Sequence, residues 1–159
     1  MRTILLSFSP IYYDILKSGD KVFEYRKRFC NEKVKAYLYL GKPVQQIVGI
    51  LWLDKRIQLS SWKEKYKDDL KVLGRIESYL QRNKYAMPVL KYQEIEAINI
   101  SDVKEMFPEF YIPLSFRNIE ENSDLLKYLE SRTKYCGNTI IHNFDNIDLD
   151  RICEMWWRS

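Results

Sequence analysis

Glycine is scarce in this 159-residue chain, and its five glycines never lie close together. Walker loops and dinucleotide-binding fingerprints need clustered glycines so that backbone amides can approach a phosphate, so the sequence excludes both. Histidine is scarcer still, because His142 is the single one. One histidine excludes the usual His-paired metal sites and leaves a Cys–His zinc site dependent on scattered cysteines. We therefore expect neither a metal nor a cofactor.

Cysteine is also sparse, with Cys30, Cys136 and Cys153 far apart and no C-x-x-C pair. An odd number of scattered cysteines favours reduced thiols over a disulfide framework. A nucleophile pair of Cys136 or Cys153 with His142 would require the fold to bring the two side chains together. No apolar run is long enough to cross a bilayer, and polar residues interrupt the apolar start of the chain before it forms an export signal. The sequence predicts a cytoplasmic protein with no membrane partner.

The residues that are present are typical of a folded protein. Hydrophobic residues make up 46% of the chain and charged residues 30%, which is ordinary for a globular protein. The length suits one domain with a proper core and is short for two.

Positive charge is concentrated in one early segment. Residues 17–42 carry eight basic and three acidic side chains, a net charge of +5, whereas the whole chain has a net charge of +4. A local positive field favours phosphate binding. Lysines that protect a strand edge from aggregation would give the same pattern, so charge alone leaves both interpretations open.

The first strand and helix have clear sequence boundaries. Residues 3–8 predict a strand, and Pro10 suits the first turn of a helix with Ser9 as its N-cap. That helix should end at Ser18, because Gly19 stands where a left-handed C-terminal residue is preferred.

Alternation in two following strands, residues 21–29 and 34–40, sorts their side chains into faces. In the first strand, aromatic residues form the expected core face and charged residues the opposite surface. In the second, aliphatic residues point inward and the others outward. Charged and aromatic side chains thus share the predicted surface: Glu24, Arg26, Arg28, Lys35, Tyr37 and Tyr39.

The middle of the chain continues with strands and inserted helices. Residues 46–53 are almost continuously apolar, which indicates a strand buried on both faces. Ser61 and Glu64 form a capping-box pattern that predicts a helix start, and Gly74 should end or bend a helix there. The remaining expected elements are a strand at 85–97, a helical turn at 102–107 and a closing strand at 114–119.

The composition changes at Glu120: from this residue onward, eight acidic residues outnumber five basic ones. Leucine spacing predicts a helix near residues 125–129, with a short strand after it. The apolar stripe of residues 149–156 predicts a terminal amphipathic helix, and its tryptophans, Trp156 and Trp157, should cover the domain. An exposed tryptophan patch for a partner protein is the alternative.

The segment from Gly19 to Arg26, GDKVFEYR, follows the predicted first helix and resembles the G-x-K-x-x-E-x-R signature of ASCH domains in the PUA-like superfamily. Ordered neighbours agree, among them LLS at residues 5–7 and P-x-S-F at residues 113–116. The resemblance covers about residues 1–119, as several segments in the expected order.

This resemblance implies an α+β fold, a PUA-like mixed β-barrel with helices at its mouth. The ASCH domain would span residues 1–119, and residues 120–159 would form a C-terminal helical extension packed on it. The resemblance also implies a cleft between the first helix and the motif strand that holds RNA or a nucleotide.

In such a cleft Lys21, Arg26 and Arg28 would contact phosphate oxygens, and Tyr37 or Tyr39 would stack on an unpaired base. Ser115 would donate a hydrogen bond from the opposite wall. The Glu24 carboxylate would either hold Arg26 or Lys21 in place or accept hydrogen bonds from a base edge. The candidate nucleic-acid-binding residues are Lys21, Glu24, Arg26, Arg28, Lys35, Tyr37, Tyr39, Ser115 and Phe116.

The function expected first is binding of RNA, either single-stranded or as a modified nucleotide, in a basic cleft. The alternative is hydrolysis of RNA or of acylated nucleosides, with Lys21 and Glu24 as catalytic residues. Relatives that act on acetylated cytidine carry the motif lysine and a threonine three residues later, and here Glu24 replaces that threonine, so their nucleophile is missing. A transcription-related protein-interaction module is the third hypothesis. Enzyme status stays open.

Overall fold

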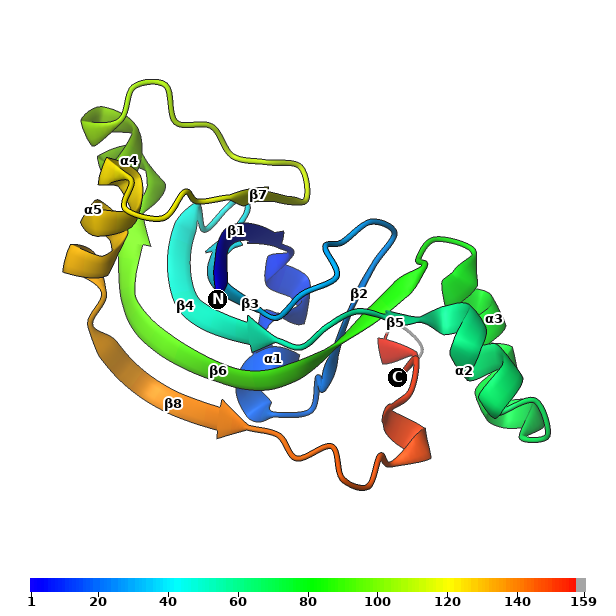
Figure 1. Ribbon diagram of the computed structural model, residues 1–159. Coiled ribbons are helices and arrows are strands. Elements are labelled where there is room, and N and C mark those ends of the chain that lie inside the picture. Colours follow the sequence, from blue (N-terminus) through cyan, green and yellow to red (C-terminus); the bar gives the residue numbers. More distant parts are fainter. Residues whose placement is uncertain (157–159) are drawn as a thin grey trace.

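The strands of this chain form a mixed sheet that curls into a half-barrel, with helices at its ends (Figure 1). The computed structural model describes residues 1–156. Within them the strands are β1 (Arg2–Phe8), β2 (Phe23–Arg26), β3 (Val34–Leu40), β4 (Gln46–Leu53), β5 (Ile57–Gln58), β6 (Tyr85–Asn99), β7 (Phe116–Asn118) and β8 (Tyr135–Ile141). The helices are α1 (Tyr13–Ser18), α2 (Leu59–Lys65), α3 (Leu70–Leu80), α4 (Ile100–Met106) and α5 (Asp124–Arg132), with 3-10 turns at Pro10–Tyr12 and Leu149–Arg151. The predicted α+β class is confirmed, and the predicted mixed β-barrel takes the form of a half-barrel.

One long strand, β6, holds the sheet together. The strand order is β2-β6-β4-β3-β1-β7, and β5 and β8 also pair with β6. β1 runs parallel to β3, whereas the other pairings are antiparallel. The early residues of β6 pair with β2 and β5, and its later residues pair with β4 and β8. The motif strand β2 is therefore fixed to the sheet through β6, at the opposite end of the strand order from β1.

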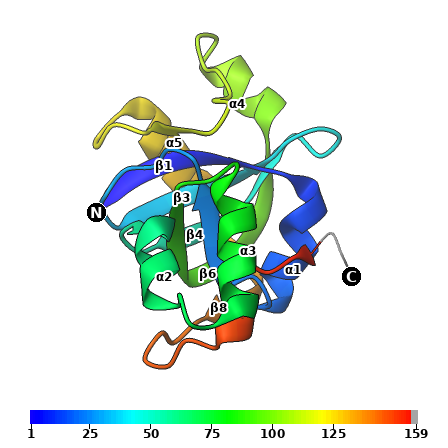
Figure 2. The ribbon, with the colours of Figure 1, turned by 90° about the vertical axis from the view of Figure 1, so that its right-hand side faces the viewer.

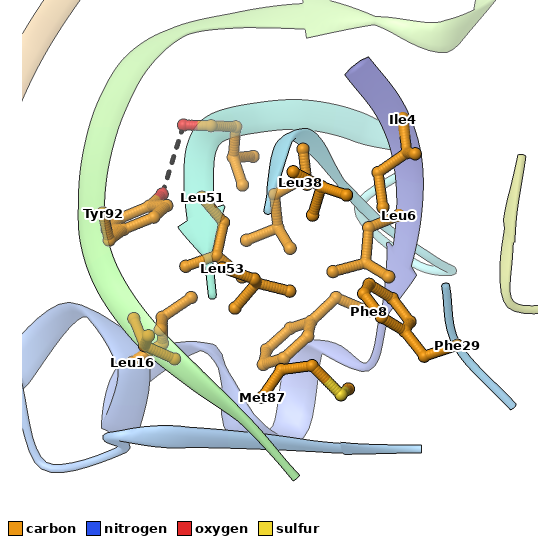
Figure 3. Close-up of a cluster of buried hydrophobic side chains, with 14 of the residues drawn as sticks. Ile4, Leu6, Phe8, Leu16, Phe29, Leu38, Leu51, Leu53, Met87 and Tyr92 are labelled. Carbon is orange, nitrogen blue, oxygen red and sulfur yellow. Dashed lines mark hydrogen bonds between the residues drawn. The ribbon is translucent and has the colours of Figure 1, made fainter. Parts of the chain in front are cut away.

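The main core, called the inner core below, lies inside the curl of the sheet (Figure 3). Leu6 of β1, Leu38 of β3 and Leu51 of β4 meet there and are fully buried. Tyr92 of β6 borders this cluster, and its hydroxyl donates to the Val48 carbonyl at 3.4 Å (Figure 3). Alternate residues of β1 and β3 thus supply the apolar burial that drives the sheet to curl.

A second core, called the outer core below, lies on the other face of the sheet, under α4 and α5. Tyr37 is fully buried and Tyr39 is 5% exposed, and both pack in one cluster with Val103 of α4 and Leu129 of α5. The prediction that these tyrosines face outward is wrong. Alternation in β3 separates its two faces correctly, but it does not tell whether helices cover the second face.

Several predicted boundaries are confirmed in the first half of the chain. The strands expected at residues 34–40 and 46–53 match β3 and β4. The first helical segment ends where predicted, because Gly19 takes the left-handed conformation with φ 87°. Ser9 precedes the turn in extended conformation but makes no side-chain capping hydrogen bond. β2 is shorter than the strand expected at residues 21–29.

The helix boundaries predicted in the middle of the chain are wrong. α2 begins at Leu59, so Ser61 lies inside it, and the Ser61 hydroxyl donates to the Gln58 carbonyl instead of capping. The capping side chain in this region is Asp69, whose carboxylate accepts from the Val72 N–H at the start of α3. Gly74 lies within α3 and does not end it. The α2 and α3 pair faces the viewer in Figure 2.

The C-terminal segment adds to the sheet and carries less helix than predicted. α5 packs on the outer core, and β8 pairs with β6. The domain boundary at residue 119 stays a prediction. The prediction of a terminal amphipathic helix is wrong. A 3-10 turn at Leu149–Arg151 instead leads into a tight turn with Cys153 at φ 51°. Tertiary contacts hold this turn, since Ile152 and Cys153 are fully buried. Trp157 lies outside the described residues.

Within residues 1–156, no helix combines the length and the apolar character that a membrane crossing needs. The same residues contain no group of three or more His, Cys, Asp or Glu side chains placed to hold a metal ion. Cys30, Cys136 and Cys153 are free thiols, as their spacing predicted.

Gly49 of β4 gives a direct test of the packing inside the curl. A Cβ added at Gly49 would overlap the Tyr92 ring, which is fully buried and bonded through its hydroxyl to Tyr13. We expect Gly49→Ala to lower the free energy of unfolding by about 1–3 kcal/mol, because overpacking forces buried groups apart. Chemical denaturation followed by circular dichroism measures this.

The matched control is Gly74→Ala. No atom lies within 4 Å of a Cβ added at Gly74, which is exposed within α3. Alanine is the better helix former, so this variant should gain roughly 0.5–1 kcal/mol. Equal stability of Gly49→Ala and wild type would contradict the close contact with Tyr92.

Candidate functional site

A hollow of about 720 Å³ opens where the end of β1, the motif strand β2 and the C-terminal end of α3 meet. We call this hollow the basic cleft. Its lining residues are Ser7, Phe8, Ser9, Tyr12, Lys21, Glu24, Tyr25, Arg26, Lys27, Ser78, Tyr79, Gln81, Arg82, Asn83 and Trp156. The elements come from both ends and the middle of the chain, so the fold assembles a site that no single segment contains.

Lys21 enters the cleft because of the turn that follows α1. The Ile15 carbonyl accepts hydrogen bonds from the N–H groups of Asp20 and Lys21, at 3.1 and 3.2 Å. Lys21 is 8% exposed, and its ammonium lies 5.4 Å from the centre of the Tyr25 ring. It forms no ion pair within 4.0 Å among residues 1–156. Burial lowers the pKa of Lys21, and the nearby Glu24 carboxylate only partly opposes this.

Glu24 is buried with one of its two oxygens unpaired. Oε1 accepts from Arg26 Nε at 3.3 Å and from the Tyr25 N–H at 3.2 Å. Oε2 is buried and has no hydrogen-bond partner in the part of the chain that the structure describes. A buried carboxylate oxygen without a donor is costly, so its presence in a cleft indicates a place for a donor from a ligand.

Arg26 is committed to contacts within the protein. Its Nη2 donates to the Ser7 carbonyl at 2.8 Å, and its Nη1 donates to Ser115 Oγ at 3.3 Å. With the Glu24 pair, these bonds connect β2 to β1 and to the residue before β7. The ion pair that the sequence allowed between Glu24 and Arg26 is therefore present, and Arg26 serves as a structural link as well as a cleft residue.

The other predicted residues lie outside the lining. Arg28 is exposed, and the Lys35 ammonium lies 5.8 Å from the centre of the Tyr37 ring. Phe116 packs against Phe29 in the inner core, with ring centres 4.8 Å apart. Of the nine candidates, Lys21, Glu24 and Arg26 line the cleft and Ser115 contacts Arg26 from behind, whereas Tyr37 and Tyr39 belong to the outer core.

Sequence reasoning missed the aromatic side chains of the cleft. Tyr25 is on the face that alternation assigned to the core, and it packs against a core cluster and also lines the cleft. Its ring stands edge-on to Tyr79, with centres 4.5 Å apart. Burial raises the pKa of both hydroxyls above the usual tyrosine value, so both are neutral at physiological pH. Phe8, Tyr12 and Trp156 complete the aromatic lining. Tyr25 occupies an unspecified position of the signature, between Glu24 and Arg26, and no sequence pattern placed α3 or Trp156 beside it.

The lining has a clear excess of positive charge. Lys21, Arg26, Lys27 and Arg82 are cations, and Glu24 is the carboxylate among the described lining residues. A concave surface with an excess of one charge concentrates the electric field and attracts ligands of the opposite charge. Positive charge beside aromatic rings is the combination that binds unpaired nucleotides.

Comparison with known proteins gives a structural likeness. No family model matches the sequence, and no curated protein does. Crystal structures of ASCH from Zymomonas mobilis match with TM-scores of 0.63 to 0.64 at 19% sequence identity, and they include the unaltered protein and variants with a serine or a tyrosine replaced. The matches cover 84% of this chain and 96% to 100% of those chains. The chain therefore has the fold of these ASCH structures, an α+β fold with a curled mixed sheet.

Proposed function

We propose that this chain binds single-stranded RNA, or a single modified nucleotide, in the basic cleft. The observation that carries the proposal is the buried Glu24 Oε2, which has no hydrogen-bond partner within residues 1–156, beside the buried Lys21 side chain, which forms no ion pair there. Buried charges are normally paired, because removal from water is costly. A ligand that carries an anionic group and an N–H donor would satisfy both. A nucleotide carries both groups.

The phosphate of such a ligand would be bound by Lys21, Lys27 and Arg82. Lys27 and Arg82 are exposed at the surface of the cleft, whereas Arg26 is already bonded to Ser7 and Ser115. Charge-assisted hydrogen bonds to phosphate are among the stronger polar contacts in proteins. These three cations therefore supply the electrostatic part of the affinity.

The base would be recognised by Glu24. A carboxylate oxygen accepts from amino or imino groups on a base edge, as carboxylates do from cytosine N4. The cleft volume of about 720 Å³ is that of a small-molecule site. Bases within a duplex are stacked and paired, so only an unpaired nucleotide presents that edge to such a hollow.

Binding to a short single-stranded RNA should weaken as salt rises, because each phosphate contact releases counterions. We expect Lys27→Ala and Arg82→Ala each to reduce affinity several-fold and to lower the salt slope by roughly 0.7, measured by fluorescence polarisation between 50 and 200 mM salt. The control is Lys104→Ala, an exposed lysine on α4 at the other end of the molecule (Figure 1). Absence of RNA binding by the wild type at low salt would reject the proposal.

Lys21→Met should separate binding from stability. Because burial lowers the folded-state pKa of Lys21, its charged form costs stability below that pKa, and the cost fades as pH rises toward 10.5. We expect Lys21→Met to lose RNA binding yet to unfold at a higher temperature than wild type at pH 7. The difference in midpoint should shrink as pH is raised in calorimetric scans. A Lys21→Met protein that is less stable than wild type at pH 7 would show that a native partner already satisfies the ammonium.

Hydrolysis of RNA or of an acylated nucleoside is a second candidate, favoured by the lowered pKa of Lys21 beside a carboxylate with a free oxygen. A more readily deprotonated amine is better suited to act as a base or nucleophile. Incubation with single-stranded RNA and with acylated cytidine should then yield product at a rate that rises with pH, and Lys21→Met should abolish it. Substrates that stay intact under conditions where RNA binds would eliminate catalysis and leave binding in place.

A further inference from the structure

The segment that follows the second 3-10 turn is anchored to α3. Arg75 of α3 donates from Nη2 to the Leu149 carbonyl at 2.7 Å and from Nε to the Ile152 carbonyl at 3.0 Å. Ile152 and Cys153 are fully buried in the cluster that α2, α3 and β2 form. These contacts fix the direction in which the chain leaves Cys153.

Two tyrosines of the cleft hold the same segment by their hydroxyls. The Tyr25 hydroxyl accepts from the Cys153 N–H at 2.8 Å, and the Tyr79 hydroxyl donates to the Glu154 carbonyl. Cys153 itself is held at φ 51°, a conformation that non-glycine residues adopt rarely. The polar ends of the tyrosines thus position the segment, and Trp156, two residues beyond Glu154, becomes part of the cleft lining.

We infer that Trp156 is the surface on which the base of the bound nucleotide stacks. The inference rests on the proposed function and extends it to a residue of the C-terminal segment. Tryptophan offers the largest aromatic face in proteins, and Trp156 is half-buried at the cleft. Lys21, Lys27 and Arg82 then bind phosphate while Trp156 and Glu24 bind the base.

The experiment compares two ligands of equal charge: a short single-stranded RNA and an abasic ribose-phosphate oligomer of the same length. Fluorescence polarisation measures the affinity of wild type, Trp156→Leu and Trp156→Phe for each. Loss of one stacked base should weaken binding of Trp156→Leu to the RNA by between about five-fold and about a hundred-fold. Its affinity for the abasic oligomer should not change, and Trp156→Phe should retain most of the RNA affinity.

The control variant is Tyr111→Leu, since Tyr111 is 58% exposed and lies outside the cleft lining. It should bind both ligands as wild type does, and thermal unfolding should confirm that all variants fold. Equal RNA affinity of Trp156→Leu and wild type would overturn the inference, as would an equal loss for both ligands, which would make the segment structural only. Wild-type protein that binds the two ligands equally well would also overturn it while leaving phosphate binding intact. Binding of neither ligand would reject the proposed function and the stacking inference together.

Discussion

The bonds of Arg26 are the constraint on which the cleft depends. β2 and β1 lie far apart in the strand order, so no backbone ladder joins them. Arg26 of β2 joins them by side chain, through the Ser7 carbonyl at the end of β1 and the Ser115 hydroxyl before β7. The half-barrel is thus linked across its open side by a guanidinium, and the cleft lies where the ladder of the sheet is missing. Ligand sites commonly form at such interruptions of a sheet, where polar side chains have room to converge.

This arrangement gives each residue of the signature a physical task. Gly19 takes the left-handed turn that ends α1, and the turn directs Lys21 into the cleft. Glu24 and Arg26 lie two residues apart in β2, on the same face, so the carboxylate orients the guanidinium at 3.3 Å. Glycine and arginine therefore serve the fold, and glutamate serves it through Oε1, while its Oε2 has no hydrogen-bond partner within residues 1–156. The lysine forms no ion pair within residues 1–156, and we propose that it binds the ligand.

The sequence predicted those parts of the fold that depend on local patterns. Alternation in β3, the apolar run of β4 and the glycine after α1 each define an element without reference to the rest of the chain. It failed where a distant segment decides the outcome. Tyr37 became a core residue because α4 and α5 cover its face of the sheet, and residues 149–156 form a docked turn because Arg75 bonds their carbonyls. The same reason explains the cleft: the motif predicted Lys21, Glu24 and Arg26, whereas the aromatic lining from α3 and the C-terminal segment had no local signature.

The position of the C-terminal segment links stability to binding. Tyr25 and Tyr79 contribute rings to the cleft and hydroxyls to the segment, so the same two side chains shape the site and hold its last aromatic residue. Burial of Ile152 and Cys153 under α3 stabilises that contact through apolar area removed from water. Lys21 and Glu24 act in the opposite direction, because burial disfavours the charged form of Lys21, and Glu24 Oε2 is buried without a hydrogen-bond partner in the part of the chain that the structure describes. The cleft therefore combines aromatic side chains that stabilise the fold with two polar side chains, Lys21 and Glu24, that destabilise it. A ligand that pairs with Lys21 and Glu24 would remove this destabilisation, and the free energy recovered would add to its affinity.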